Sequence, residues 1–151
     1  NCSLPGSLWC LSELAANRLA SGEIDNEIRL RDRLIGGLTE RIPEITLTGH
    51  RTKRLPYHAS ICVKYVEGEG MLLLMDAAGI GVSSGSACTS GSLEPSYVLL
   101  ALGLDHPTAH GSVRMTLSKD TNDEDIDYVL EKFPPIVEKL RYLSPFYKKN
   151  Q

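Results

Sequence analysis

The sequence has no apolar run near the roughly 20 residues needed to cross a bilayer. The longest candidate, MLLLMDAAGIGV at 71–82, is interrupted by Asp76 and Gly79. No positive charge precedes the apolar stretch at the N-terminus, so no secretory signal is predicted. We therefore expect a cytoplasmic protein without a membrane partner. Because the chain starts at Asn1 rather than Met, we also expect it to be a piece of a longer protein.

Neither sign of charge dominates the sequence. Its 151 residues carry 16 basic and 19 acidic side chains, a net charge of −3. The basic side chains are scattered, with small clusters only at Arg51–Arg54 and Lys148–Lys149. This balance argues against nucleic acid as the main partner, because a polyanion selects a basic surface. The hydrophobic content of 42% predicts a globular chain with a real core.

Closely spaced cysteine pairs are also missing. None of Cys2, Cys10, Cys62 and Cys88 forms a C-x-x-C pair, so a zinc site is not predicted. Cys62 lies in an apolar strand pattern and is interpreted as a core thiol, whereas Cys2 and Cys10 lie near the start and are interpreted as incidental. Free thiols are typical of a reducing, cytosolic setting.

Apolar spacing predicts regular elements along most of the chain. Predicted helices cover 4–20, 24–42, 67–79, 96–102 and a final segment from Asn122 to Leu143, and predicted strands cover 45–49, 59–65, 80–82 and 112–118. The first two helices are either one helix kinked near Gly22 or a pair. Pro134-Pro135 is expected to kink or restart the last helix, and His106, before Pro107, is expected to cap a turn.

Two patterns assign faces to these elements. In strand 112–118 the apolar residues alternate with Arg114 and Thr116, which places Arg114 on a polar face. The second helix is expected to bury one stripe, made of Ile24, Ile28, Arg31, Ile35, Leu38 and Ile42. The element order predicts an α/β (α+β) fold, a small, mainly antiparallel sheet with helices packed on one face.

The segment SSGSACTSGSLEPSYVLLALGL at 83–104 places one thiol, Cys88, among glycines, serines and threonines. This composition predicts an exposed loop that can move. A helix follows it, and a helix N-terminus favours an anion such as a thiolate. From the residues alone, Cys88 is incidental, a redox-sensing or metal-capturing thiol, or a catalytic carrier thiol.

The same segment resembles the active-site cysteine loop of cysteine desulfurases of the NifS/IscS type, which belong to the class V aminotransferase superfamily. The likeness continues in YVEGEGMLLLMDAAGIGVSSGSAC, in GSVRMTLSKDTNDEDIDYVLEKFPPIVEKLRYLSP and in RLRDRLIGGL, and so covers nearly the whole chain. It implies the small C-terminal domain of a fold-type I transferase that depends on pyridoxal phosphate (PLP).

The resemblance also implies roles for two residues. Cys88 matches the cysteine that takes sulfur from L-cysteine as a persulfide and leaves L-alanine. Arg114 matches the arginine that holds the substrate carboxylate, a task suited to a guanidinium fork. No role is assigned to His58 or His110.

The groups that hold PLP have no match in this chain. No lysine lies in the family's Ser-His-Lys context, so the large PLP-binding domain is expected to be absent. This chain alone is therefore expected to bind no PLP and to be inactive. The expected division is a linking helix or helix pair at 1–42 and a small domain at 43–151, with the cysteine loop at 83–95.

The resemblance implies that the parent enzyme is a homodimer that passes sulfur to iron–sulfur scaffold proteins or other acceptors. The rival interpretation is a non-enzymatic domain that relays sulfur or binds a scaffold.

Overall fold

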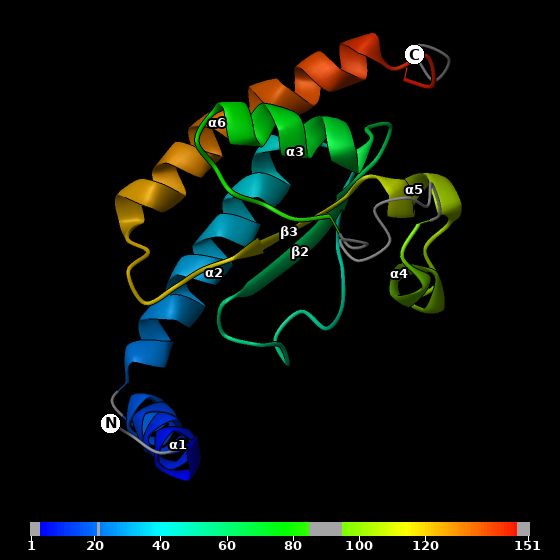
Figure 1. Cartoon of the computed structure of the whole chain (residues 1–151). Coiled ribbons are helices and arrows are strands. Elements are labelled where there is room, and N and C mark those ends of the chain that lie inside the picture. The colour runs from blue at the N-terminus through cyan, green and yellow to red at the C-terminus, as the bar shows by residue number, and fades with distance from the viewer. Residues whose placement is uncertain (1–3, 21, 85–94, 148–151) are drawn as a thin grey trace.

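The computed structural model describes residues 4–20, 22–84 and 95–147. Six helices and three strands follow one another along this part of the chain (Figure 1): α1 (Leu4–Ala20), α2 (Glu23–Arg41), β1 (Ile45–Leu47), β2 (His58–Val63), α3 (Gly68–Ala77), α4 (Tyr97–Ala101), α5 (His106–His110), β3 (Ser112–Thr116) and α6 (Asp123–Leu143). All the predicted helices are present, and the short helix α5 was not predicted. Pro107 suits its first turn and Asp105 is its N-cap residue, so His106 begins this helix rather than capping a turn.

The three strands form one antiparallel sheet in the order β1-β2-β3. The predicted antiparallel sheet is therefore confirmed. The prediction of a strand at 80–82 is wrong, because these residues form no strand. Only Ser83, the next residue, pairs with β3, through one isolated bridge to Arg114. The apolar residues that suggested a strand, Ile80 and Val82, instead pack against the main core.

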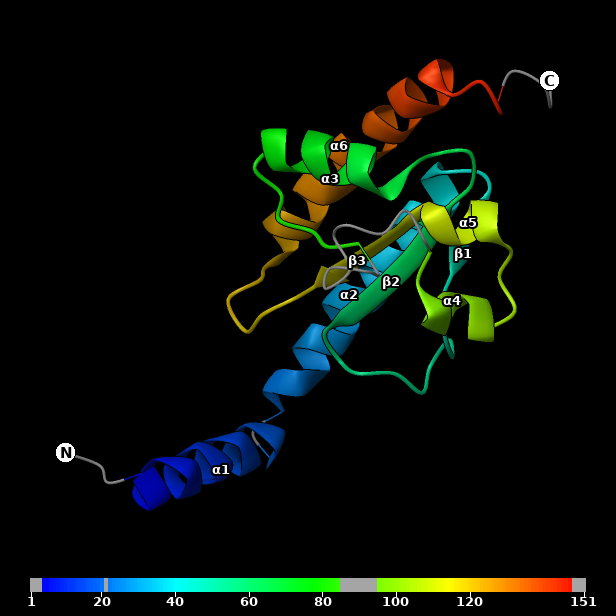
Figure 2. The ribbon, with the colours of Figure 1, turned by 45° about the vertical axis from the view of Figure 1, so that its right-hand side comes forward.

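Different elements cover the two faces of the sheet. Ala59, Ile61 and Val63 of β2 point into the main core, which α2, α3 and α6 complete. Helices α2, α3 and α6 thus lie on one face, but the prediction that all helices pack on one face is wrong, because α4 and α5 lie on the other. Cys62 points to the opposite face, where Leu99 of α4 and Ala109 of α5 bury it completely. Figure 2 brings α4 and α5 forward, across the sheet from α2.

The buried face of α2 differs from the predicted stripe. Arg31, Leu38 and Ile42 are buried as expected, but Ile24, Ile28 and Ile35 are only half-buried. Leu30 and Leu34 are almost completely buried in their place. The reason is that α2 packs against both the sheet and α6. Its buried surface is therefore broader than one stripe and is rotated about the helix axis relative to the predicted stripe.

Helix α1 makes few contacts with the rest of the described chain. It projects from the N-terminal end of α2, away from the sheet (Figure 2), and Gly22 separates the two helices with a left-handed φ of 77°. Trp9 and Leu11 are 77% and 62% exposed. Leu11, on the apolar side of the predicted helix, is therefore not covered by other described residues. None of the described helices has the length and apolar character needed to cross a membrane.

Helix α6 continues through two prolines, Pro134 and Pro135, so the predicted restart is wrong. Pro134 has no N–H, so it cannot satisfy the carbonyl of Leu130 four residues earlier. Arg41 at the end of α2 supplies the missing donor, with Nη1 at 2.7 Å from that carbonyl oxygen. A side chain from a neighbouring helix thus stabilises α6 where its own backbone does not.

We expect Arg41→Ala to lower the free energy of unfolding by about 1–3 kcal/mol, because a carbonyl in a largely buried turn loses its donor. The loss should shrink in a Pro134→Ala background, where the helix regains a backbone N–H for Leu130. Urea unfolding of the four proteins of this double-mutant cycle measures the difference. Equal losses in both backgrounds would contradict this role of Arg41.

Candidate functional site

Arg114 lies at the centre of β3 and is exposed, while its neighbours Val113 and Met115 are buried in the core. This alternation confirms its predicted place on the polar face. The backbone of Arg114 pairs with Ser83 through two hydrogen bonds, of 3.0 and 2.6 Å. Its Nη2 also donates to the Ser83 hydroxyl at 3.3 Å. The chain entering the segment at 85–94 is therefore held against Arg114.

A hollow of about 410 Å³ lies beside Arg114 on the polar face of the sheet. The sheet, the loop between β1 and β2, and α4 all contribute to its wall. The residues that line it are Thr48, Gly49, His50, Lys53, Arg54, Leu55, His58, Ser60, Ser96, Val98, Leu99, Leu102 and Arg114. Its charged side chains are cationic, so the hollow is suited to a small anion.

Cys88 and its predicted loop movement lie outside the described residues. On each side of the segment at 85–94, a described residue contacts either Arg114 or the hollow. Ser83 is bonded to Arg114, and Ser96 lines the wall. Ser83 thus contacts Arg114 directly, and Ser96 shares the hollow with Arg114, the other residue to which the family resemblance gives a role.

Several polar groups of the hollow are already engaged by the protein. Arg54 donates to the carbonyls of His50 and Thr48 at 2.9 and 2.8 Å, which ties the loop to the sheet. The ring Nδ1 of His50 accepts from the backbone N–H groups of Thr52 and Lys53 at 3.1 and 2.9 Å. These two side chains therefore build the wall of the hollow.

His58 and Cys62 lie on the polar side of β2 and differ in their surroundings. The pKa of the half-buried His58 is lowered, first by burial and then by the charges of Arg54 and Arg114. Burial raises the pKa of the Cys62 thiol to about 11, so it stays protonated near neutral pH. Cys62 is thus confirmed as a buried thiol, and its protonated state makes it a poor nucleophile.

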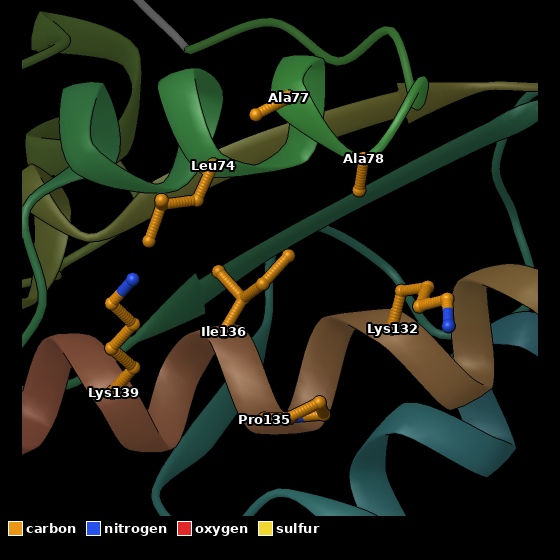
Figure 3. Close-up of a pocket in the computed structure, with 7 residues that line it drawn as sticks. All are labelled: Leu74, Ala77, Ala78, Lys132, Pro135, Ile136 and Lys139. Carbon is orange, nitrogen blue, oxygen red and sulfur yellow. The ribbon is translucent and has the colours of Figure 1, made fainter.

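A second hollow of about 330 Å³ lies on the other side of the sheet, between α3 and α6 (Figure 3). Leu74, Pro135 and Ile136 give it an apolar lining, with Lys132 and Lys139 at its edge. It contains no nucleophile other than lysine among the described residues. Its place across the sheet from Arg114 separates it from the candidate site.

The residues around Arg114 do not fit the PLP cofactor that the resemblance implies. A PLP site needs a lysine for the aldehyde and a carboxylate near the ring nitrogen. Among the described residues that line the hollow, none is Asp or Glu, and the one lysine, Lys53, lies on an exposed loop. The hollow is therefore suited to a carboxylate group rather than to the whole cofactor.

Known proteins resemble this chain in sequence and fold. Residues 8–129 match the family described as Aminotransferase class-V. The chain is 50% identical over 136 residues to a cysteine desulfurase of Gluconacetobacter diazotrophicus, covering 87% of this chain and 34% of that protein. It is 49% identical over 121 residues to cysteine desulfurase NifS of Azotobacter vinelandii, covering 80% and 30% respectively.

Solved structures give the same comparison. A NifS-like protein from Rickettsia africae matches with a TM-score of 0.70 and 25% identity, over 83% of this chain and 31% of that one. The chain thus spans about a third of the length of the relatives it matches.

Proposed function

Since this chain belongs to the class V aminotransferase family, we propose that it is the C-terminal part of a cysteine desulfurase. The enzyme converts L-cysteine to L-alanine and leaves the sulfur as a persulfide on Cys88. Residues 1–42 form its linking helices and residues 43–151 its small domain. A large domain outside this chain holds PLP.

The observation that carries this proposal is that Arg114 is bonded to Ser83, before the Cys88 segment, and lines a hollow that Ser96, after the segment, also lines. Its bond to Ser83 fixes the start of the segment, and the hollow that it lines includes Ser96 at the other end. A guanidinium at this place binds the carboxylate of an amino acid and keeps it within reach of the Cys88 segment.

The role of Cys88 follows from thiolate chemistry. Its sulfur bonds to the sulfur of L-cysteine, and the bond between that sulfur and the β-carbon breaks. The carbon accepts the electron pair and a proton, so the products are L-alanine and a Cys88 persulfide. Sulfur is oxidised and carbon is reduced, and no external oxidant is required.

The fate of the sulfur belongs to the same proposal. The persulfide passes to an iron–sulfur scaffold or another acceptor protein, and the enzyme works as a cytoplasmic homodimer. The relatives named cysteine desulfurase, which are 49–50% identical to the chain, support the desulfurase activity from which this sulfur would come.

We expect Arg114→Ala in the enzyme that contains this chain to lower kcat/KM for L-cysteine about 10- to 150-fold, mainly through KM. The range corresponds to the loss of a charge-assisted hydrogen bond of about 1.5–3 kcal/mol. Steady-state alanine release measures it. Arg33→Ala is a matched control, because Arg33 is an arginine of α2 that pairs with Asp123 and Asp127 on α6. Equal kinetics for wild type and Arg114→Ala would refute the assignment.

A further inference from the structure

His58 and Arg114 lie diagonally across two paired strands, on the same face of the sheet. Arg114 is opposite Ser60, and His58 is opposite Thr116, two residues further along each strand. Diagonal neighbours of this kind lie about 7–8 Å apart, within reach of one small ligand. Both side chains line the 410 Å³ hollow.

Unlike Arg54, His50, Thr48 and Ser60, His58 has a side chain in the hollow that is not engaged by the described protein. Arg54 and the ring of His50 bind the backbone of the loop, and the Thr48 hydroxyl lies 2.7 Å from that of Ser60. Among the described residues, no hydrogen-bond partner is present for the His58 ring, although the residue is half-buried. An imidazole always has at least one N–H to donate.

Arg114 by itself does not occupy every acceptor position of a carboxylate. One of its terminal nitrogens, Nη2, already faces the Ser83 hydroxyl at 3.3 Å. A carboxylate has two oxygens with about four lone-pair positions. A second donor on the same face would therefore fix its orientation as well as its place.

We propose that His58 is a second carboxylate-binding residue, which donates a ring N–H to the substrate carboxylate held by Arg114. This inference rests on the proposed function, because it names a further contact for the same amino-acid substrate. The role is one of positioning, and the ring is neither the nucleophile nor the group that holds the cofactor.

The charges around His58 give this contact a pH dependence. Burial, and then the charges of Arg54 on the loop and Arg114 on β3, lower the pKa of the ring, so it is neutral near pH 7. The same loop also carries His50 and Lys53, whereas the side chains that α4 contributes are uncharged. Burial lowers the pKa of Arg54 most, and of the two charged neighbours on α2, Arg31 lowers this pKa and Asp32 raises it. A bound carboxylate offsets the cationic field and raises the pKa of the ring. Proton and carboxylate then bind together, so carboxylate affinity increases as the pH falls through this range.

Kinetics of the enzyme that contains this chain test the contact. His58→Phe keeps a ring but removes the donor, and we expect it to raise KM for L-cysteine about tenfold, the equivalent of one hydrogen bond to a charged group. His58→Gln retains an N–H donor and should restore part of the loss, with kcat nearly unchanged in both. His106→Gln is the control, because His106 lies on α5 and does not line the hollow. Unchanged KM in both His58 variants would overturn the inference.

A second measurement is independent of desulfuration. Propionate, a carboxylate with the carbon skeleton of alanine, is titrated into this chain while NMR follows the ring resonances of His58. We expect the pKa of the ring to rise on binding and the response to disappear in Arg114→Ala. A ring that does not respond to propionate would overturn the inference. If the ring responds in this chain but the enzyme that contains the chain has no desulfurase activity, the proposed function is contradicted and the carboxylate contact stands.

Discussion

Replacement of Cys88 by serine should abolish persulfide formation in the enzyme that contains this chain. We expect the rate of alanine release from L-cysteine to fall at least about 1,000-fold, as is typical when a catalytic nucleophile is removed. A hydroxyl is far less ionised and less nucleophilic than a thiol at neutral pH, so serine cannot take over the attack on sulfur. Binding of L-cysteine should persist, because Arg114 and the hollow are unchanged.

The other thiols provide the control for this prediction. Cys62 is completely buried with a pKa of about 11, whereas Cys10 is exposed on α1. We expect both serine variants to retain sulfur transfer, and peptide mapping after incubation with L-cysteine to place the additional sulfur on Cys88. Additional sulfur on Cys62 or Cys10, or normal turnover by Cys88→Ser, would contradict the proposed function.

Gly111→Ala should destabilise the fold more than Arg41→Ala does. A Cβ at this position would lie far inside the van der Waals contact distance of the Val63 carbonyl oxygen and 2.9 Å from that of Val66. The two backbones are held together by a 2.8 Å hydrogen bond from the Val63 N–H to the Gly111 carbonyl, so neither moves freely. We expect a loss of about 3 kcal/mol or more, which corresponds to a fall of roughly 10 °C in Tm for a chain of this size.

Gly36 on α2 is the matched control. It is exposed, and a Cβ there would have no neighbour within 4 Å. Gly36→Ala should therefore raise stability by about 0.5–1 kcal/mol, because alanine loses less backbone entropy in a helix. Thermal unfolding of the two variants compares the effects directly. A Gly111→Ala protein as stable as wild type would show that the β2–β3 region yields to a methyl group at little cost.

The sequence alone predicted most of the regular elements, because their signals are local. The alternation of Val113 and Met115 with Arg114 predicted both a strand and its polar face. Signals failed where a distant contact decides the outcome. The prolines of α6 suggested a kink or restart, but the helix does not restart, and Arg41 supplies a donor to the Leu130 carbonyl that Pro134 cannot satisfy. Ile80 and Val82 suggested a strand, but they pack against the core instead of pairing.

The candidate site divides in the same way. Cys88 and Arg114 were identified from the sequence, because a thiol among glycines and serines and the motifs around it are local features. That Arg114 is bonded to Ser83 follows only from the fold, since 31 residues separate them. His58 gave no signal in the sequence. Its relation to Arg114 arises from the register of two strands that are far apart along the chain, and an antiparallel register depends on packing and on the turns between strands. Local motifs and the family resemblance thus indicated which groups to propose for the chemistry, whereas strand pairing decided which of the described residues share one hollow.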